Sequence, residues 1–297
     1  MSILNQHQWA RLLLIVTVVV AVSVAWMASS SLGVPALPGF NASLLGQPSP
    51  IMALIAVVAM LSIGVGISGI LLGRVHHEAT VFGAAVALSV ISLRGGAMRY
   101  VLYDGGSPGV LLRCAAEMLL LGLAMLGVWL ASRPLCSRGI LRETLELPRD
   151  VDDHEPIDQR LLGTATHVAM MIVLLKFLLV TQDKPQVIAG VGLSALLASL
   201  VAHQFVPTRP GAWYWSSPIL VGIVGYVGSY LGTPSVQPGD PQGFFAPLAR
   251  PLPVDYASAG VAGALLGYWM RRRKVMVASR QSDCPAPGAS LPSDGHA

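Results

Sequence analysis

One acidic residue lies inside a long apolar stretch, with a basic residue one helical turn before it. Arg113 and Glu117 belong to the apolar run 110–131 and are four residues apart. In a helix, this spacing puts both side chains on one face. At the helical rise per residue, Glu117 would lie roughly 10 Å from the end of that helix, within a bilayer. Charged groups at such depth are costly and mark solute or ion pathways, so this pair is a candidate solute or ion contact.

Further charges are expected at the same end of the protein. Lys176 lies in the apolar run 161–180, roughly 6 Å from its end by the same rise, and Arg99 and Asp104 precede position 110. Lys176 would meet Glu117 if their helices are neighbours. The sequence therefore predicts an outward-facing polar site made of Arg113, Glu117, Lys176, Arg99 and Asp104. The alternative interpretation is a structural ion pair, with the longer side chains reaching the membrane surface.

Two histidines occupy matching places in two similar apolar segments. His77 lies near the end of the segment 64–78, and His203 lies at the same place in the segment 190–204. A metal site needs a third ligand or a carboxylate at ligand spacing, and neither is present, so both are weak metal candidates. We expect them to lie at the membrane interface, like the aromatic residues Tyr214, Trp215 and Trp269, which stand near the ends of apolar runs.

Signatures of catalysis are missing from the sequence. There is no H-E-x-x-H, G-x-S-x-G, phosphate-binding loop or dinucleotide fingerprint. The three cysteines, Cys114, Cys136 and Cys284, are scattered and odd in number, which indicates neither a disulfide framework nor a metal site. We therefore expect no cofactor and no metal, and an enzyme is the least favoured functional class.

The composition is typical of a protein solvated by lipid. Apolar residues make up 54% of the chain, charged residues only 11%, and the mean hydropathy is +0.64, whereas soluble proteins carry about 25% charged residues. The sequence predicts an all-α integral membrane protein with about eight transmembrane helices. The expected spans are about 12–29, 51–73, 79–93, 110–131, 161–180, 186–205, 217–232 and 256–270. The net charge of +4 does not indicate nucleic-acid binding, because the basic residues lie at span ends.

The distribution of basic residues predicts the orientation. Most Lys and Arg residues fall on the cytoplasmic side if the N-terminus is cytoplasmic, in accordance with the positive-inside rule. Eight spans return the C-terminus to that side, where the cluster 271–274 (RRRK) follows the last span. We expect a protein integral to the cell (inner) membrane with both termini in the cytoplasm. The first span loosely resembles a cleaved signal peptide, but we favour a retained helix.

Two pairs of segments are similar along the chain. Residues 64–78 and 190–204 share seven of fifteen positions, and 124–133 and 264–273 share five of ten. We interpret these matches as a duplicated unit of four helices, both copies in the same orientation and related by an axis along the membrane normal. Eight unrelated spans with chance similarity are the alternative.

Glycines four residues apart predict close helix packing in lipid. Such pairs are Gly69 with Gly73, Gly228 with Gly232, and Gly263 with Gly267. Small residues at this spacing let two helix backbones approach each other.

The expected organisation has four parts: a first repeat (1–133), a cytoplasmic linker (134–159), a second repeat (160–274) and a disordered cytoplasmic tail (275–297). The favoured function is transport or conduction of a small solute at the contact between the repeats. The alternative is a non-catalytic structural or assembly subunit, with the bilayer and a membrane-protein partner or a second copy around it. A membrane enzyme is the third hypothesis.

Overall fold

The computed structural model describes residues 3–31, 43–45, 49–71, 78–105, 109–137, 156–206, 211–232 and 243–282, and all regular structure within them is helical. In chain order the elements are α1 (Ile3–Ser31), α2 (Pro50–Leu71), α3 (Ala79–Arg94), α4 (Met98–Gly105), α5 (Gly109–Ser137), α6 (Ile157–Leu178), α7 (Lys184–Phe205), α8 (Ala212–Gly232), α9 (Ala246–Ala249), α10 (Pro253–Asp255), the π-helix η1 (Tyr256–Gly260) and α11 (Val261–Ser282).

Five of the described helices are long and apolar enough to cross a membrane: α1, α2, α5, α6 and α7. The expectation of an all-helical polytopic membrane protein is therefore confirmed. Helix α3 is apolar but has only 16 residues, fewer than the roughly 20 that span a bilayer. The remaining two expected spans coincide with α8 and with η1 and α11. Eight spans in all thus remain a prediction.

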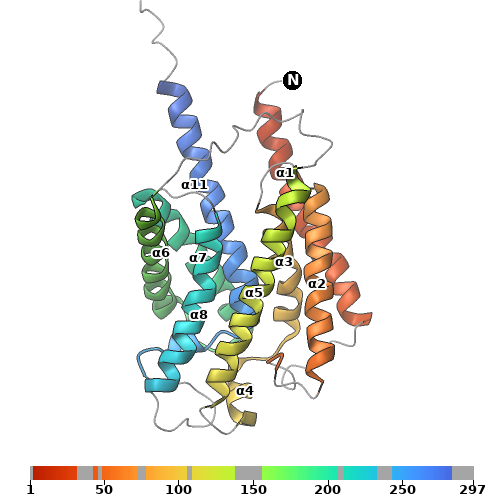
Figure 1. Cartoon of the computed structure of the whole chain (residues 1–297), viewed down its shortest axis with the longest axis vertical. Coiled ribbons are helices and arrows are strands. Elements are labelled where there is room, and N and C mark those ends of the chain that lie inside the picture. Colours follow the sequence, from red (N-terminus) through yellow and green to blue (C-terminus); the bar gives the residue numbers. More distant parts are fainter. Residues whose placement is uncertain are drawn as a thin grey trace, which may run out of the picture.

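The long helices form a single bundle whose successive members run in alternating directions, so α1 begins and α11 ends at the same end (Figure 1). We call this the terminal end and the opposite one, which carries α4, the far end. The first half, α1 to α5, packs on the second half, α6 to α11, mainly through α5 with α8 and α3 with η1. Helix α11 continues to Ser282, past the expected boundary at 274.

Helix α3 forms the centre of the bundle. Its residues are almost all buried, including Ala84, Leu88 and Val90, which have no exposed surface. It contacts α1, α2 and α5 in its own half and η1, α7 and α11 in the other. A helix surrounded by protein on all sides needs no lipid-facing surface, which explains how a span too short to cross the bilayer alone is accommodated.

Glycines bring two pairs of helices into close contact. On α2, a methyl group added to Gly64 would overlap the backbone of Gly83 on α3. On α11, Gly263 and Gly267 lie against the backbone of α7, beside the carbonyls of Gly192 and Leu196. The predicted packing role of the 263/267 pair is confirmed.

The other two predicted glycine pairs do not bring helix backbones together. A methyl group on Gly69 would have only Thr80 nearby, at 3.9 Å, and its partner Gly73 lies outside the described residues. Gly232 faces open space, and Gly228 packs against the ring of Phe245 rather than a helix backbone. The sequence spacing alone did not distinguish contact-forming glycines from exposed ones.

The two halves differ in how their helices pack. In the first half α2 packs closely on α3, the next long helix along the chain, whereas in the second half α7 packs on α11. Under the predicted repeat, α3 would correspond to α8 and α5 to α11. The contacts across the two halves differ from this: α3 meets η1, which leads directly into α11, and α5 meets α8. By these contacts α3 corresponds to α11, and α5 corresponds to α8. The duplication therefore remains a prediction from sequence similarity.

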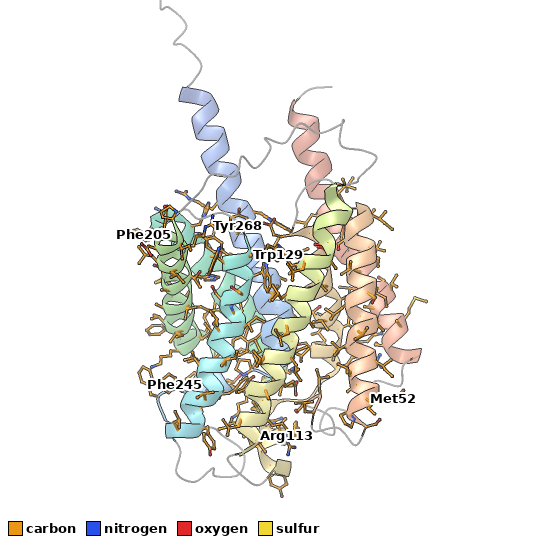
Figure 2. The ribbon with its side chains drawn as sticks, in the orientation of Figure 1. Met52, Arg113, Trp129, Phe205, Phe245 and Tyr268 are labelled. Atoms are coloured by element: carbon orange, nitrogen blue, oxygen red, sulfur yellow. The ribbon has the colours of Figure 1, made fainter. Side chains whose placement is uncertain are left out.

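Three of the aromatic residues expected near the membrane interface are buried between helices. Tyr214 is 1% exposed, Trp215 3% and Trp269 4%. Trp269 packs on Phe82 of α3, with ring centroids 5.2 Å apart. Tyr268, the residue before Trp269 on α11, lies towards the terminal end. Figure 2 shows it at a level similar to that of Trp129 on α5. These rings join helices to one another, because their size fills the space between helix backbones.

Candidate functional site

Glu117 is buried as predicted, but its contacts are with a loop segment and not with a cation. The side chain is 2% exposed. One carboxyl oxygen, Oε2, accepts a hydrogen bond from the Ser43 hydroxyl at 2.7 Å and from the Leu45 backbone N–H at 3.3 Å. Residues 43–45 come from the connection between α1 and α2. Glu117 therefore ties this connection to α5.

The other predicted site residues lie apart from Glu117. Arg113 is exposed at the far end of α5, where Figure 2 shows it. Lys176 on α6 places its ammonium group over the ring of Phe244. Helix α8 packs against both α5 and α6, which separates Lys176 from Glu117.

Arg99, one of the two predicted site residues before α5, makes its contacts away from Glu117. Arg99 on α4 stacks over the ring of its neighbour Tyr100 and donates a hydrogen bond to its hydroxyl at 3.2 Å. The side chain of Asp104 lies outside the described residues. Among the side chains that the structure describes, no hydrogen bond or ion pair joins two members of the predicted site.

His203 lies in a buried aromatic cluster near the terminal end. It is 7% exposed, and its Nδ1 is 3.0 Å from the Tyr214 hydroxyl, which itself donates to the carbonyl of Val206 at 3.2 Å. Tyr268 stacks on Tyr214, with centroids 5.2 Å apart. The two tyrosines enclose His203, and its position at the membrane interface stays a prediction. His77 lies outside the described residues.

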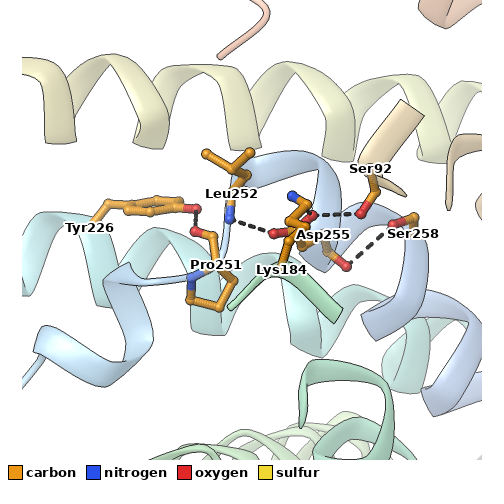
Figure 3. A network of polar contacts seen from close by, with 7 residues as sticks. All are labelled: Ser92, Lys184, Tyr226, Pro251, Leu252, Asp255 and Ser258. Atoms are coloured by element: carbon orange, nitrogen blue, oxygen red, sulfur yellow. Dashed lines mark hydrogen bonds and ion pairs between the residues drawn. The ribbon is translucent and has the colours of Figure 1, made fainter. Parts of the chain in front are cut away.

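The strongest polar site of the described structure centres on Asp255, which sequence reasoning missed (Figure 3). This carboxylate has no exposed surface. Its Oδ1 accepts hydrogen bonds from Ser92 of α3 and from the ammonium group of Lys184, both at 2.6 Å. Its Oδ2 accepts the backbone N–H of Leu252 at 2.8 Å. Three chain segments thus meet at one carboxylate.

Local sequence explains why Asp255 stands where it does. Leu252 is the N-cap of the helical run that continues into α11, Pro253 follows it, and Asp255 is the third helical residue. A carboxylate at this position reaches back to the free N–H of the N-cap, and its charge suits a helix N-terminus. Proline suits the first helical position because it has no N–H to leave unpaired.

Lys184 occupies the opposite situation. It is the first residue of α7, where a positive charge opposes the helix dipole. Its side chain is 14% exposed. The ion pair with Asp255 offsets both the dipole and the loss of water around the ammonium group. The cluster Ser92–Asp255–Lys184 therefore places two opposite charges and a hydroxyl at the contact between the halves.

The backbone around Asp255 is interrupted and held by further hydrogen bonds. The five residues that follow it form the π-helix η1. Before it, the carbonyl of Pro251 accepts the Tyr226 hydroxyl (Figure 3), and that of Leu248 accepts the Tyr256 hydroxyl at 2.8 Å. Irregular backbone inside a membrane protein persists where protein groups satisfy it, and π-helical turns are frequent at functional sites.

A second polar contact between the halves lies at the other end of α3. Glu78, which precedes α3, is 4% exposed, and its Oε1 accepts the backbone N–H of Gly211 just before α8 at 3.2 Å. The second half therefore holds α3 near both of its ends, through Glu78 at the terminal end and Ser92 towards the far end.

Two signals in the sequence pointed to the Asp255 cluster. Asp255 immediately precedes the expected span 256–270, and Lys184 precedes the expected span 186–205. Each stands just outside an expected span, because the apolar run begins one or two residues after it. Their pairing depends on α3, α7 and α10 meeting, and no local pattern specifies that contact.

No group of three or more potential metal-ligating side chains occurs among the described residues. Comparison of the chain with protein families, with curated proteins and with solved structures finds no match.

Proposed function

We propose that this polytopic membrane protein transports a small solute across the cell membrane, through a path that opens at the contact between its two halves. The observation that carries the proposal is the buried ion pair of Lys184 and Asp255 at an interrupted helix. Charges buried in membrane proteins are costly and serve ion or solute pathways. Interrupted helices at the contact between two halves form the binding sites of many transporters.

The two polar contacts of α3 suggest how such a path would open. Ser92 binds Asp255 towards the far end, and Glu78 binds the N–H of Gly211 at the terminal end. With both contacts formed, the halves are closed on both sides. Release of one contact while the other persists would expose the interior to one side of the membrane, as alternating access requires. Both contacts cross between the halves, which supports this role.

The site predicted from sequence has a place in this proposal. Arg113 and Glu117 on α5, Lys176 on α6 and Arg99 on α4 belong to the far half of the bundle, on the same side as Asp255. We propose that these residues and Asp104 contact solute as it approaches. Both termini would face the cytoplasm, which puts the far end outside.

Uptake by reconstituted protein tests the proposal. Purified protein in liposomes is offered radiolabelled amino acids, sugars and inorganic ions, with empty liposomes as the background. We expect uptake of at least one class, and a loss of about tenfold or more with Asp255→Asn. Asp183→Asn is the matched control, because Asp183 lies just before α7 and is exposed. Uptake by Asp255→Asn equal to the wild type, in protein shown to be folded, contradicts the proposal.

The closed state of the cluster favours a second candidate, a structural or assembly subunit. Asp255 is fully enclosed and its acceptors are occupied, and the glycine contacts of α2 with α3 and α7 with α11 are backbone to backbone. Such packing is also what a rigid scaffold needs. Native mass spectrometry of protein extracted from its own membrane separates the two. A stoichiometric partner or second copy, together with no uptake of any offered solute, would favour the scaffold.

A further inference from the structure

The carboxyl group of Glu117 has an asymmetric environment. Oε2 accepts the Ser43 hydroxyl at 2.7 Å and the Leu45 N–H at 3.3 Å. Oε1 is buried and has no hydrogen-bond partner in the described part of the chain. A carboxylate shares its charge between both oxygens, so an ionised Glu117 would leave half of its charge buried without a donor.

In the part of the chain that the structure describes, no cation compensates a negative charge on Glu117. Among the described residues, no lysine or arginine lies within ion-pair distance of it, and Arg113, one turn away, is exposed. The other titratable groups nearby are neutral in their ordinary forms, namely Cys114 on α5 and Tyr226 on α8.

The comparison with Asp255 shows what an ionised carboxylate requires in this protein. Asp255 has an ammonium group at 2.6 Å and donors on both oxygens. Glu117 has donors on one oxygen and no counter-charge. An ionised carboxylate buried without a partner is so costly that the group takes up a proton instead.

We propose that Glu117 is a proton-binding site, with the proton on Oε1 and the carbonyl oxygen Oε2 held by residues 43–45. These three residues lie between the carboxyl group and the surface. Ser43, which contacts the carboxyl group, is 5% exposed, whereas Leu45 at the other end of the segment is 37% exposed. Displacement of the segment from Glu117 removes the donors and admits water, and this is the step at which the proton exchanges. The proton-binding proposal requires no solute, so its test does not depend on the proposed transport.

Infrared difference spectroscopy tests the proton directly. The spectrum of wild-type protein in lipid at neutral pH is compared with that of Glu117→Gln. We expect the variant to lose a carbonyl band of a protonated carboxylic acid. Loss of the carboxylate bands instead overturns the proposal. The substitution must remove one or the other, so the spectrum decides. Asp183→Asn, which removes an exposed carboxylate, is the matched control and should lose carboxylate bands alone.

Ser43→Ala provides a second test that keeps Glu117 in place, in case the glutamine variant does not fold. Removing the hydroxyl deletes the shorter hydrogen bond to Oε2. If Oε2 belongs to a protonated acid, the acid carbonyl band moves to higher frequency, since a hydrogen bond to a carbonyl lowers its stretching frequency. A shift of the carboxylate bands, with the acid carbonyl region unchanged, contradicts the assignment.

Discussion

Two buried carboxylates on facing elements illustrate how neighbours decide the role of a residue. Asp255 is matched by the Lys184 ammonium group, the Ser92 hydroxyl and a backbone N–H. Among the described residues, the donors to Glu117 are a hydroxyl and a backbone amide of residues 43–45. Removing one member of a buried ion pair leaves the other charge uncompensated, which costs more than the net contribution of the pair.

Asp255→Asn is expected to destabilise the protein by about 3–5 kcal/mol, because Lys184 would remain buried without its counter-charge. Thermal unfolding in detergent, followed by circular dichroism, measures the loss. The double variant Lys184→Met with Asp255→Asn should recover part of it, since no charge is then left unpaired. Asp183→Asn should unfold like the wild type, and an equal loss in this control would assign the effect to general surface charge.

Tyr214→Phe tests the aromatic cluster near the terminal end. The substitution removes the donor to the Val206 carbonyl and the hydroxyl that binds His203. We expect a loss of about 1–3 kcal/mol in unfolding free energy, as for buried groups left without a partner. Tyr103→Phe is the control, because Tyr103 is 76% exposed. Equal stability of both variants would show that the Tyr214 hydroxyl contributes no net stability.

At the scale of helices, glycine decides which pairs come into contact. Gly64 allows α2 to reach the backbone of α3, and Gly263 allows α11 to reach α7. In lipid, where burying apolar surface gives little gain, close backbone packing provides much of the association energy. The interrupted run α10–η1–α11 is the counterpart, because its backbone leaves regular α-helical bonding. Side chains of α3 and α7 bind the Asp255 carboxylate within it, and the Tyr226 hydroxyl of α8 donates to the carbonyl of Pro251 just before it.

Gly64→Ala is expected to lower stability by about 1–3 kcal/mol, because the added methyl group overlaps the backbone of Gly83. Gly66→Ala on the same helix is the matched control, since its methyl group would meet nothing within 4 Å. Alanine is the better helix former, so the control should unfold like the wild type or slightly above it. Equal loss in both variants, measured by thermal unfolding, would contradict the assigned contact.

At the scale of the whole molecule, the alternating helices place the start of α1 and the end of α11 together (Figure 1). The basic cluster 271–274 follows the expected last span at this end. Because basic residues remain on the cytoplasmic side, the whole bundle has one expected orientation. The far end then faces outwards, and Asp255 and Glu117 lie in the half of the bundle on that side.

Reporter fusions test this orientation. Green fluorescent protein, which fluoresces when it remains in the cytoplasm, and alkaline phosphatase, which is active only after export, are fused to each terminus in separate experiments. We expect fluorescence and no phosphatase activity at both ends. An active phosphatase fusion at one terminus alone would mean an odd number of spans and would contradict the proposed topology.

Much of the helical organisation could be predicted from the sequence. The apolar runs match the helices closely, since α2, α6 and α7 begin and end within a few residues of the expected spans. Burial of Glu117 was also predicted. The pairing of Glu117 with Lys176 was not found, because α8 packs against both of their helices. Asp255 and Lys184 were missed because each stands one or two residues outside an apolar run.

Hydropathy and length are local properties, and they alone determined that this chain is an all-helical membrane protein and where its long helices lie. The partners of each charge are a property of distant contacts. Lys184, Ser92 and Asp255 belong to three segments up to 163 residues apart, and only the packing of α3 against η1 and α7 brings them together. The tertiary structure therefore decided that Asp255 has a counter-charge and that Glu117 has none among the described residues. This difference matters because burial removes the water that would otherwise serve as a partner to either carboxyl group.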